Sequence, residues 1–236
     1  MSTVDPAADA TIRHRILQAI FERRLPPGEK LTEERLAELF SVSRTIVRHA
    51  LARLAQDGIV VQRRNHGATV AAPTRSETRQ FLAVRRMVEP AIVTQLAGRL
   101  NAPDVSRLRD HLAAENAARK TGDRPTLVRL TGEFHLLLGE LTQNKVLVRL
   151  LTELQALTCL AILLYARGEH EACPPDEHSQ IVAAIIAGEG KQGAALMLKH
   201  LDHVEAEMDL SEPVARSVDL AEALGIRPRK SSAAKG

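Results

Sequence analysis

The segment from residue 43 to residue 54 places side chains suited to nucleic acid on one side of a predicted helix. At about 100° per residue, Arg44, Thr45 and Arg48 share one side, and the opposite side is apolar. Guanidinium groups bind phosphate oxygens and guanine edges, and a threonine can contact the DNA backbone or a thymine methyl group. Ser43 stands at the N-cap position. The pattern favours a helix that contacts a DNA major groove, although a solvated amphipathic helix has the same pattern when it stands alone.

Three histidines in the second half of the chain are the other candidates for chemistry. His135, His178 and His200 each have apolar neighbours in a predicted helix. Imidazole is the commonest side-chain ligand of zinc-like ions, and three neutral ring nitrogens leave one coordination position open. No short ligand spacing such as His-Glu-x-x-His or Cys-x-x-Cys is present in the sequence. The residues alone therefore favour separate packed or surface histidines over a metal site.

Two short helices and a tight link must position the arginines. Residues 34–40 form an amphipathic helix, a link at 41–43 follows, and the helix with the arginines comes next. This spacing is typical of a helix-turn-helix. An earlier helix, over residues 12–24, ends before a Pro-Pro-Gly turn.

A hairpin is predicted directly after these helices. Residues 59–62 and 68–70 have the pattern of strands, and the loop between them contains three basic side chains, including His66. Gly67 tolerates the positive φ that such a loop requires. The loop is suited to phosphate or minor-groove contact, and a basic surface loop without a function is the alternative.

From residue 77 onward helical periodicity predominates. The breaks contain Pro, Gly and Asn, and they separate six predicted helices, near 77–99, 104–120, 125–142, 145–167, 176–188 and 190–208. The predicted fold class is therefore mostly α: an N-terminal winged helix-turn-helix with three helices and a two-stranded wing, followed by an all-α helical bundle. The predicted organisation is a disordered N-terminus at 1–10, the winged domain at 11–72, a linker at 73–76, the bundle at 77–210 and a flexible basic tail at 211–236.

Size and composition limit the class of protein. The 236 residues, 44% of them apolar, are enough for two buried cores, and a content of four Phe, one Tyr and no Trp favours helix packing over a β-sandwich. Residues 1–72 carry a net charge of +3 and residues 73–212 one of −3, which suits a nucleic-acid contact at one end only. No apolar run approaches the ~18 residues of a membrane span, no signal sequence is present, and two cysteines are too few for a disulfide framework. We therefore expect a cytoplasmic protein.

Motifs at the turns and helix starts of residues 12–70 carry a resemblance to a known family. They are Leu25-Pro26-Pro27-Gly28-Glu29-Lys30-Leu31, Glu34-Arg35-Leu36-Ala37, Val42-Ser43-Arg44-Thr45, Val47-Arg48, Asp57-Gly58-Ile59-Val60 and Asn65-His66-Gly67. This part resembles the winged helix-turn-helix of the GntR family of bacterial transcription regulators, and Ile46 and His49 depart from its usual pattern. The resemblance implies that operator DNA is a partner. The residues that would contact it are Arg35, Ser43, Arg44, Thr45, Arg48, His66 and Gly67.

A second set of motifs lies in residues 76–210. They are Arg85-x-x-Val88-Glu89, Glu133-Phe134-His135 with Asn144 after it, Glu177-His178-x-x-Ile181 and Leu196-Met197-x-x-His200-Leu201. They resemble the FCD effector domain of the FadR-type branch of the same family. In many such domains three histidines and an Asp hold a divalent metal, which helps to bind a small carboxylate. By position the histidines are His135, His178 and His200, and the Asp position is occupied by Thr131, a poor ligand when neutral.

Arg85 is the candidate counter-ion for the effector carboxylate, because its planar fork can hold both oxygens. A surface ion pair with Glu89, four residues later on the same helix, is an equally good explanation. The effector-binding candidates are therefore Arg85 and Thr131, and the implied cofactor is a divalent metal of the Zn, Ni or Mn type.

The residues and the resemblance together predict a ligand-responsive transcription regulator and not an enzyme. We expect a homodimer that binds double-stranded operator DNA, has no membrane partner and senses a small organic acid in the bundle. Repression is the more frequent mode in the resembling family. One alternative is a metal-dependent hydrolase with a DNA-targeting domain, although threonine at position 131 leaves no obvious general base. Another is a constitutive DNA-binding protein whose bundle only dimerises.

Overall fold

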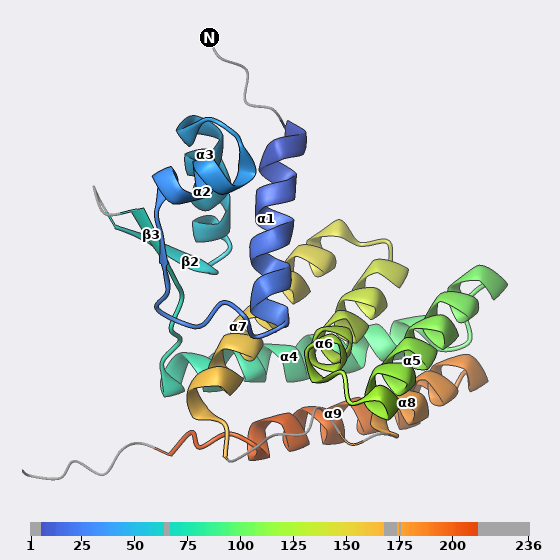
Figure 1. The fold of residues 1–236 in the computed structure, drawn as a ribbon. Coiled ribbons are helices and arrows are strands. Elements are labelled where there is room, and N and C mark those ends of the chain that lie inside the picture. Colours follow the sequence, from blue (N-terminus) through green and yellow to red (C-terminus); the bar gives the residue numbers. More distant parts are fainter. Residues whose placement is uncertain (1–5, 64–66, 168–173, 175, 212–236) are drawn as a thin grey trace, which may run out of the picture.

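The computed structural model of the protein describes residues 6–63, 67–167, 174 and 176–211. Within them the chain forms an N-terminal head, residues 6–71, and a helical body, residues 74–211 (Figure 1). A winged helix-turn-helix followed by an all-α bundle confirms the predicted fold class.

The head contains three helices and a small antiparallel sheet. Its elements are α1 (Pro6–Phe21), β1 (Lys30–Leu31), α2 (Glu33–Phe40), α3 (Arg44–Gln56), β2 (Val60–Arg63) and β3 (Gly67–Val70). The strands lie in the order β1-β3-β2, and β2 and β3 are the two predicted wing strands. The sequence does not predict β1, because two residues are too few to show an alternating pattern.

The first helix begins earlier than its hydrophobic pattern indicates. The sequence predicts a disordered stretch over 1–10, but α1 begins at Pro6. Asp9 explains the difference, because its carboxylate is only 2% exposed and bonds to His49 and Arg53 of α3. The prediction of disorder is therefore wrong from Pro6 onward, and the five residues before it lie outside the described part of the chain.

Side-chain caps begin both helices of the helix-turn-helix. The hydroxyl of Thr32 accepts the N–H of Arg35, and that of Ser43 accepts the N–H of Ile46, each at 3.4 Å. Ser41, between the two helices, has a φ of +54°, in the left-handed region that ends α2. These local features fix the angle at which α3 leaves the turn.

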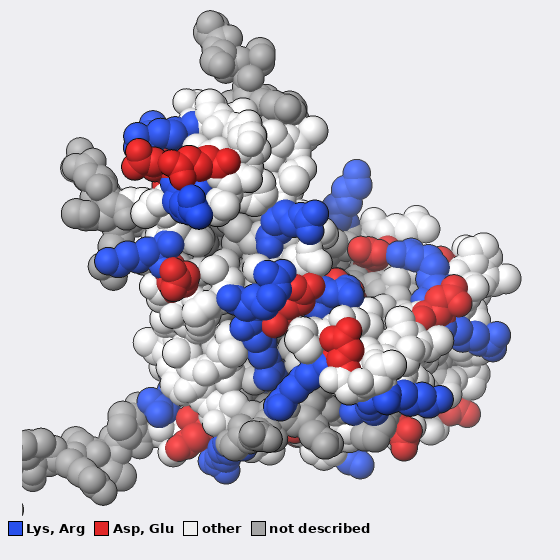
Figure 2. All heavy atoms as spheres, in the orientation of Figure 1, with Lys and Arg blue, Asp and Glu red and all other residues white. Residues whose placement is uncertain are grey.

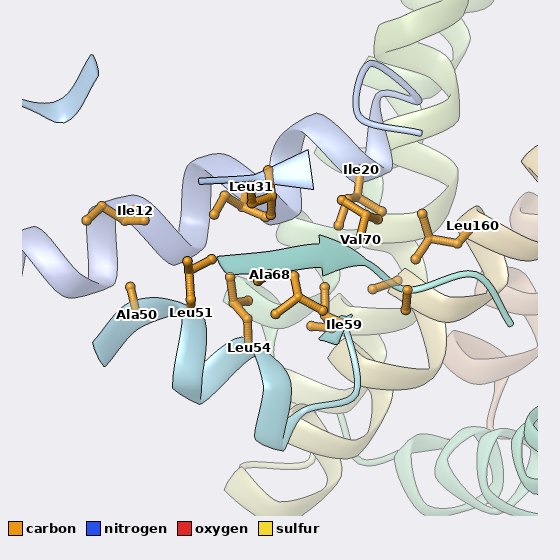
Figure 3. Close-up of a cluster of buried hydrophobic side chains, with 14 of the residues drawn as sticks. Ile12, Ile20, Leu31, Ala50, Leu51, Leu54, Ile59, Ala68, Val70 and Leu160 are labelled. Carbon is orange, nitrogen blue, oxygen red and sulfur yellow. The ribbon is translucent and has the colours of Figure 1, made fainter. Parts of the chain in front are cut away.

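An apolar core joins α1, α3 and the sheet. Figure 3 shows Ile12 and Ile20 of α1 on one side of this core and Leu51 and Leu54 of α3 on the other. Leu160, which belongs to the body, lies at the edge of the same cluster and is fully buried. Because α1 and α3 share this core, the head is expected to move as one rigid unit.

Six helices form the described body. They are α4 (Arg75–Leu96), α5 (Ala102–Thr121), α6 (Arg124–Leu141), α7 (Lys145–Tyr165), α8 (Glu177–Ala187) and α9 (Gly190–Ala206). The linker predicted at 73–76 is shorter than expected, because Thr74 caps α4 in a capping box with Glu77 and Arg75 is already helical. Residues 212–236, where the sequence predicts a flexible tail, lie outside the described residues.

Helix α4 is central to the body. It packs most extensively against α9 and α7 and also contacts α6 and α8. The three helices that carry the predicted metal-binding histidines, α6, α8 and α9, therefore all contact α4. This arrangement brings the α4 side chains Arg85 and Glu89 toward the histidines.

Helix α7 is long and apolar enough to cross a membrane by length and composition, with a mean hydropathy of 1.8 over its most apolar window. The sequence-based statement that no apolar run approaches a membrane span is therefore wrong for this helix. Its apolar residues have another explanation, because α7 packs against α1, α4 and α6. Ala156, Cys159 and Leu160 of α7 belong to the core of the head.

The head rests directly on the body. The last turns of α1 meet α6 and α7, as Figure 1 shows. Besides the shared apolar cluster, Glu22 forms an ion pair with Arg129 of α6, with 3.5 Å between Oε1 of Glu22 and Nε of Arg129. The two parts are therefore joined by a packed interface as well as by the chain between Val70 and Thr74.

Candidate nucleic-acid interface and candidate metal centre

The polar side of α3 faces solvent. The side chains of Arg44 and Arg48 are each 62% exposed, and Thr45 between them is exposed as well. The opposite side, with Val47 and Leu51, is buried in the head core. The three polar residues are thus accessible to a partner, as contact with DNA requires.

Glu33, the first residue of α2, holds the two arginines. Its carboxylate accepts from Nε and Nη2 of Arg48 at 2.9 and 2.7 Å and lies 3.9 Å from Arg44. The bond from Arg48 holds the pKa of Glu33 below its ordinary value. Figure 2 shows acidic and basic side chains side by side over α2 and α3. Both arginines thus lie beside one carboxylate, and a phosphate would have to replace it.

The four remaining predicted DNA contacts differ in their surroundings. Arg35 is 68% exposed and pairs with Glu38 on its own helix at 3.1 Å. Ser43 is exposed, but its hydroxyl is engaged in capping α3. Gly67 opens β3 with a φ of +73°, and a Cβ there would lie 2.9 Å from the carbonyl oxygen of Leu31, so only glycine fits. The wing residue His66 lies outside the described residues.

His49, the residue after Arg48 on α3, is also exposed and contacts α1. Its Nδ1 lies 3.1 Å from Oδ1 of the buried Asp9 on α1, with the side chain half exposed. Arg53, one turn later, binds the other oxygen of the same carboxylate at 3.2 Å. The imidazole therefore helps to dock α1 on α3 while it remains on the outward side of α3 with the arginines.

The three histidines come together in the interior of the body. His135 of α6, His178 of α8 and His200 of α9 are each at most 3% exposed. One ring nitrogen from each lies within 4.8 Å of the other two. The interpretation favoured by the residues alone, that the histidines are separate, is therefore wrong, because three helices far apart in the sequence converge on one point.

Each imidazole is oriented by its own carboxylate. Nδ1 of His135 bonds to Glu89 at 2.5 Å, and Nδ1 of His200 bonds to Glu177 at 2.9 Å. Nδ1 of His178 bonds to both oxygens of a third carboxylate, Glu115, at 3.0 Å. Sequence reasoning assigned no such role to these three glutamates, because each belongs to a different element from the histidine it contacts. A carboxylate on Nδ1 is the usual partner of a histidine that binds metal through Nε2.

The Nε2 atoms of the three histidines fit a metal ion. Nε2 of His178 is buried without a hydrogen-bond partner, and Nε2 of His135 and His200 are 3.3 Å apart. Two ligands bound at about 2.0–2.1 Å to a tetrahedral ion are separated by about 3.3 Å, so little rearrangement is needed. Burial lowers the pKa of His135 to about 3, which leaves its ring neutral at physiological pH, as a metal ligand must be.

The glutamates are held in their charged form. Burial alone would raise the pKa of Glu89, but the charge of Arg85 and the hydrogen bonds from Arg85 and His135 outweigh it and hold the value well below the usual range. Burial would also raise the pKa of Glu115. Hydrogen bonds from His111 and His178 outweigh burial there and lower the pKa to about 2. Negative charge therefore surrounds the triad from the side of the Nδ1 atoms.

Thr131, at the position where the resembling domains have an Asp, does not supply a ligand. Its side chain is buried, and its hydroxyl donates to the carbonyl oxygen of Val128 at 2.9 Å. A metal held by the triad would thus have three protein ligands here, and at least one coordination position would be left for another ligand.

Arg85 is buried and not, as the alternative interpretation had it, a surface residue. It is 1% exposed; its Nε donates to Glu89 at 2.6 Å and its Nη1 to Thr158 at 3.1 Å. The pair with Glu89 does form, but Nη2 remains buried without a partner. Such an orphaned donor is costly unless a ligand accepts from it.

Arg85, Thr131 and two of the three histidines, His135 and His200, line one cavity that is partly open to solvent. Gln155 also lines it, and its Oε1 is a second buried atom without a partner. A further lining residue, Arg23, belongs to the head. The cavity thus offers an unpaired cationic donor, an unpaired acceptor and two imidazoles, which suits a small anion that also carries a hydroxyl group.

Known protein families match both parts of the chain. Residues 80–203 match the FCD domain, and residues 8–70 match the bacterial regulatory proteins of the gntR family. The first match alone covers more than half of the chain.

Individual relatives and solved structures agree with the family matches. The HTH-type transcriptional regulator LutR of Bacillus subtilis (strain 168) is 29% identical over 203 residues, which cover 77% of this chain and 92% of the relative. The Uxu operon transcriptional regulator of Escherichia coli (strain K12) is 26% identical over 203 residues, 77% of this chain and 79% of the relative. A putative transcriptional regulator GntR from Rhodococcus sp. RHA1 has a TM-score of 0.73 at 22% identity, covering 85% of this chain and 96% of the other. McbR/YncC of E. coli has a TM-score of 0.74 at 18% identity, with coverages of 84% and 95%. At these identities the structural likeness supports the fold.

Proposed function

Since the chain belongs to the GntR family of bacterial regulatory proteins and is a transcription regulator with an FCD domain, we propose that it is a cytoplasmic, ligand-responsive repressor. Its head binds operator DNA, and its body senses a small organic acid. The observation that carries the proposal is the presence in one chain of an exposed arginine edge on α3 and a buried cavity with an unpaired guanidinium nitrogen. No catalytic residue is assigned.

The head contacts the duplex through α3 and the wing. Arg44 and Arg48 bind phosphates or guanine edges, and Thr45 contacts the backbone or a base methyl group. Arg35, on α2, adds a phosphate contact from its exposed position. A homodimer places two heads on a two-fold related operator, with the two recognition helices one helical turn of DNA apart.

The body holds the effector beside the triad. His135, His178 and His200 would hold a divalent ion of the Zn, Ni or Mn type, which when bound supplies a positive charge for a carboxylate. The unpaired Nη2 of Arg85 donates to that carboxylate. Glu89 bonds to both Arg85 and His135 and so fixes the distance between the two groups.

The effector changes DNA affinity through the position of the head. A ligand shifts this equilibrium only if it binds two head positions unequally, and a coupling of about 1–3 kcal/mol is sufficient for a response. The head and the body are in contact through α1, which packs on α6 and α7. A ligand could change how tightly they bind each other at this interface. A hydrolase is less well supported, because the three carboxylates that contact the triad are all engaged by imidazoles.

Substitution of the arginine edge tests the proposal. Arg48→Ala should weaken binding to the DNA upstream of the protein's own gene by about 1–3 kcal/mol, measured by fluorescence anisotropy at fixed salt. Glu33→Gln should act in the opposite direction, because it removes the carboxylate that competes with phosphate. Arg107→Ala is the matched control, since Arg107 is an exposed, ion-paired arginine of the body. Equal affinities for the wild type, Arg48→Ala and the control would remove α3 from the interface.

A further inference from the structure

A residue of the head reaches the cavity of the body. Arg23 follows the last turn of α1 and lines the same cavity as Arg85, His135 and His200. Its backbone has a φ of +56°, in the left-handed region that costs a non-glycine residue about 1–2 kcal/mol. Strained backbone of this kind is concentrated at functional sites. The turn after α1 therefore holds this arginine at the cavity at an energetic cost.

The polar groups of the cavity indicate what a ligand there must carry. Nη2 of Arg85 lacks an acceptor, and Oε1 of Gln155 lacks a donor. A carboxylate would satisfy the first, and a hydroxyl group would satisfy the second. Arg23, as a second guanidinium on the same cavity, is suited to a second carboxylate.

We propose that the ligand is a small hydroxy-dicarboxylate and that Arg23 is the contact through which it reaches the DNA-binding head. The carboxylate held by Arg85 lies at the triad, and the second carboxylate binds Arg23. This inference rests on the proposed function, in which the body is the sensing part, and it adds the class of ligand and the route to the DNA.

The route follows from the packing of the head. Arg23 directly follows α1, whose buried Ile16 and Ile20 share a core with Leu54 of α3. A ligand that binds Arg23 therefore fixes the position of the whole head, including the arginine edge, relative to the body. The ligand can contact Arg23 only when α1 is packed on α6 and α7. It therefore binds the two head positions unequally, as coupling requires.

The first experiment uses malate, succinate and lactate as probes of full-length, metal-loaded protein. Succinate lacks the hydroxyl group, and lactate lacks the second carboxylate. Thermal-shift titrations of the wild type should give the tightest binding for one enantiomer of malate, since ligand bound only to the folded state raises the Tm with the logarithm of its concentration. Lactate binding as tight as malate binding, or no shift with either enantiomer of malate, would overturn the proposal.

The second experiment substitutes the arginine itself. Arg23→Gln should weaken malate binding by roughly 10–100-fold, the loss expected for a charge-assisted hydrogen bond, and bring it to the level of lactate. It should also abolish the effect of malate on DNA affinity. Arg24→Gln is the matched control, because Arg24 is 59% exposed and pairs with Glu22.

Two further readouts separate a ligand contact from a structural role and from failure of the proposed function. Arg23→Lys retains one charge and should recover part of the malate response, and a response no better than that of Arg23→Gln would overturn the proposal. DNA binding by the wild type and its loss in Arg48→Ala are measured without malate. Normal DNA binding with an unchanged malate response in Arg23→Gln would thus refute this inference alone.

Discussion

Two arginine–glutamate pairs, one in each part of the molecule, have similar geometry and different surroundings. Arg48 and Glu33 lie on the surface of the head, with bonds of 2.7 and 2.9 Å and an arginine that is 62% exposed. Arg85 and Glu89 lie inside the body, with a bond of 2.6 Å and side chains that are 2% and 3% exposed. Water reaches the first pair and is excluded from the second.

The difference assigns the pairs opposite roles. An exposed ion pair contributes at most about 1 kcal/mol and can be exchanged for a DNA phosphate at little cost. A buried pair cannot lose one partner without leaving an uncompensated charge, so it keeps the other groups in place. The head thus has arginines that can change partner, and the body has an arginine whose remaining donor is fixed for a ligand.

The largest expected effect is on stability. Glu89→Gln removes the charge that Arg85 and His135 both contact and should destabilise the protein by about 3–5 kcal/mol, measured by urea unfolding. Glu33→Gln, the same substitution in the exposed pair, should cost less than about 1 kcal/mol. Similar losses for the two variants would show that burial does not distinguish the pairs.

The second effect concerns the metal. Protein purified without chelator should contain a near-stoichiometric divalent ion, and Glu115→Gln should weaken its binding by about 10–100-fold, because Glu115 orients His178. Elemental analysis and competition with a chromophoric chelator measure both quantities. Glu140→Gln is the control, since Glu140 forms an exposed ion pair with Arg107. A metal-free wild type, or equal metal affinity in both variants, would make the carboxylate–imidazole network purely structural.

The elements of the fold could be predicted because their signals are local. Pro-Pro-Gly, Ser43 and the Asn, Gly and Pro breaks of the body mark helix ends within the few residues around them, and the observed helices begin or end within three residues of the predicted bounds from α4 onward. The start of α1 was missed because Asp9 is held by α3, some forty residues away. A contact of that kind has no periodic signature.

The candidate metal centre, unlike the polar side of α3, was predicted only from the family resemblance. Nothing in the spacing of His135, His178 and His200 indicates that α6, α8 and α9 converge, since convergence depends on how each helix packs on α4. The orienting glutamates and the cavity contact of Arg23 could not be predicted for the same reason. Burial of Arg85 was also undecided, because a pair with Glu89 at i+4 has the same pattern on the surface and in the interior.

The smallest expected effect on stability concerns Glu153, a carboxylate between the head and the body. Its surroundings are intermediate between those of Glu33 and Glu89. Glu153 of α7 faces the head, with Oε1 3.6 Å from the position that a Cβ would take on Gly58. Burial, together with the charge of Asp57, raises the pKa of Glu153 above its ordinary value. The charged form is therefore disfavoured at this interface, because the charge of Arg149 offsets burial only in part, whereas Arg85 and His135 more than offset the burial of Glu89.

A raised pKa in the folded state fixes the sign of the pH dependence. The stabilisation by Glu153 is fully present below its unfolded pKa, decreases as pH rises toward the folded pKa, and is lost above it. Glu153→Gln should therefore stabilise the protein at pH 7 by a fraction of a kcal/mol, because the group is partly solvated, and should have no stabilising effect near pH 4. Unfolding curves at the two pH values measure this difference, and Glu140→Gln, on an exposed surface, should change neither. A destabilised Glu153→Gln at pH 7 would mean that the head and body are held together by this carboxylate, and the interface would then resemble the buried pair rather than lie between the two.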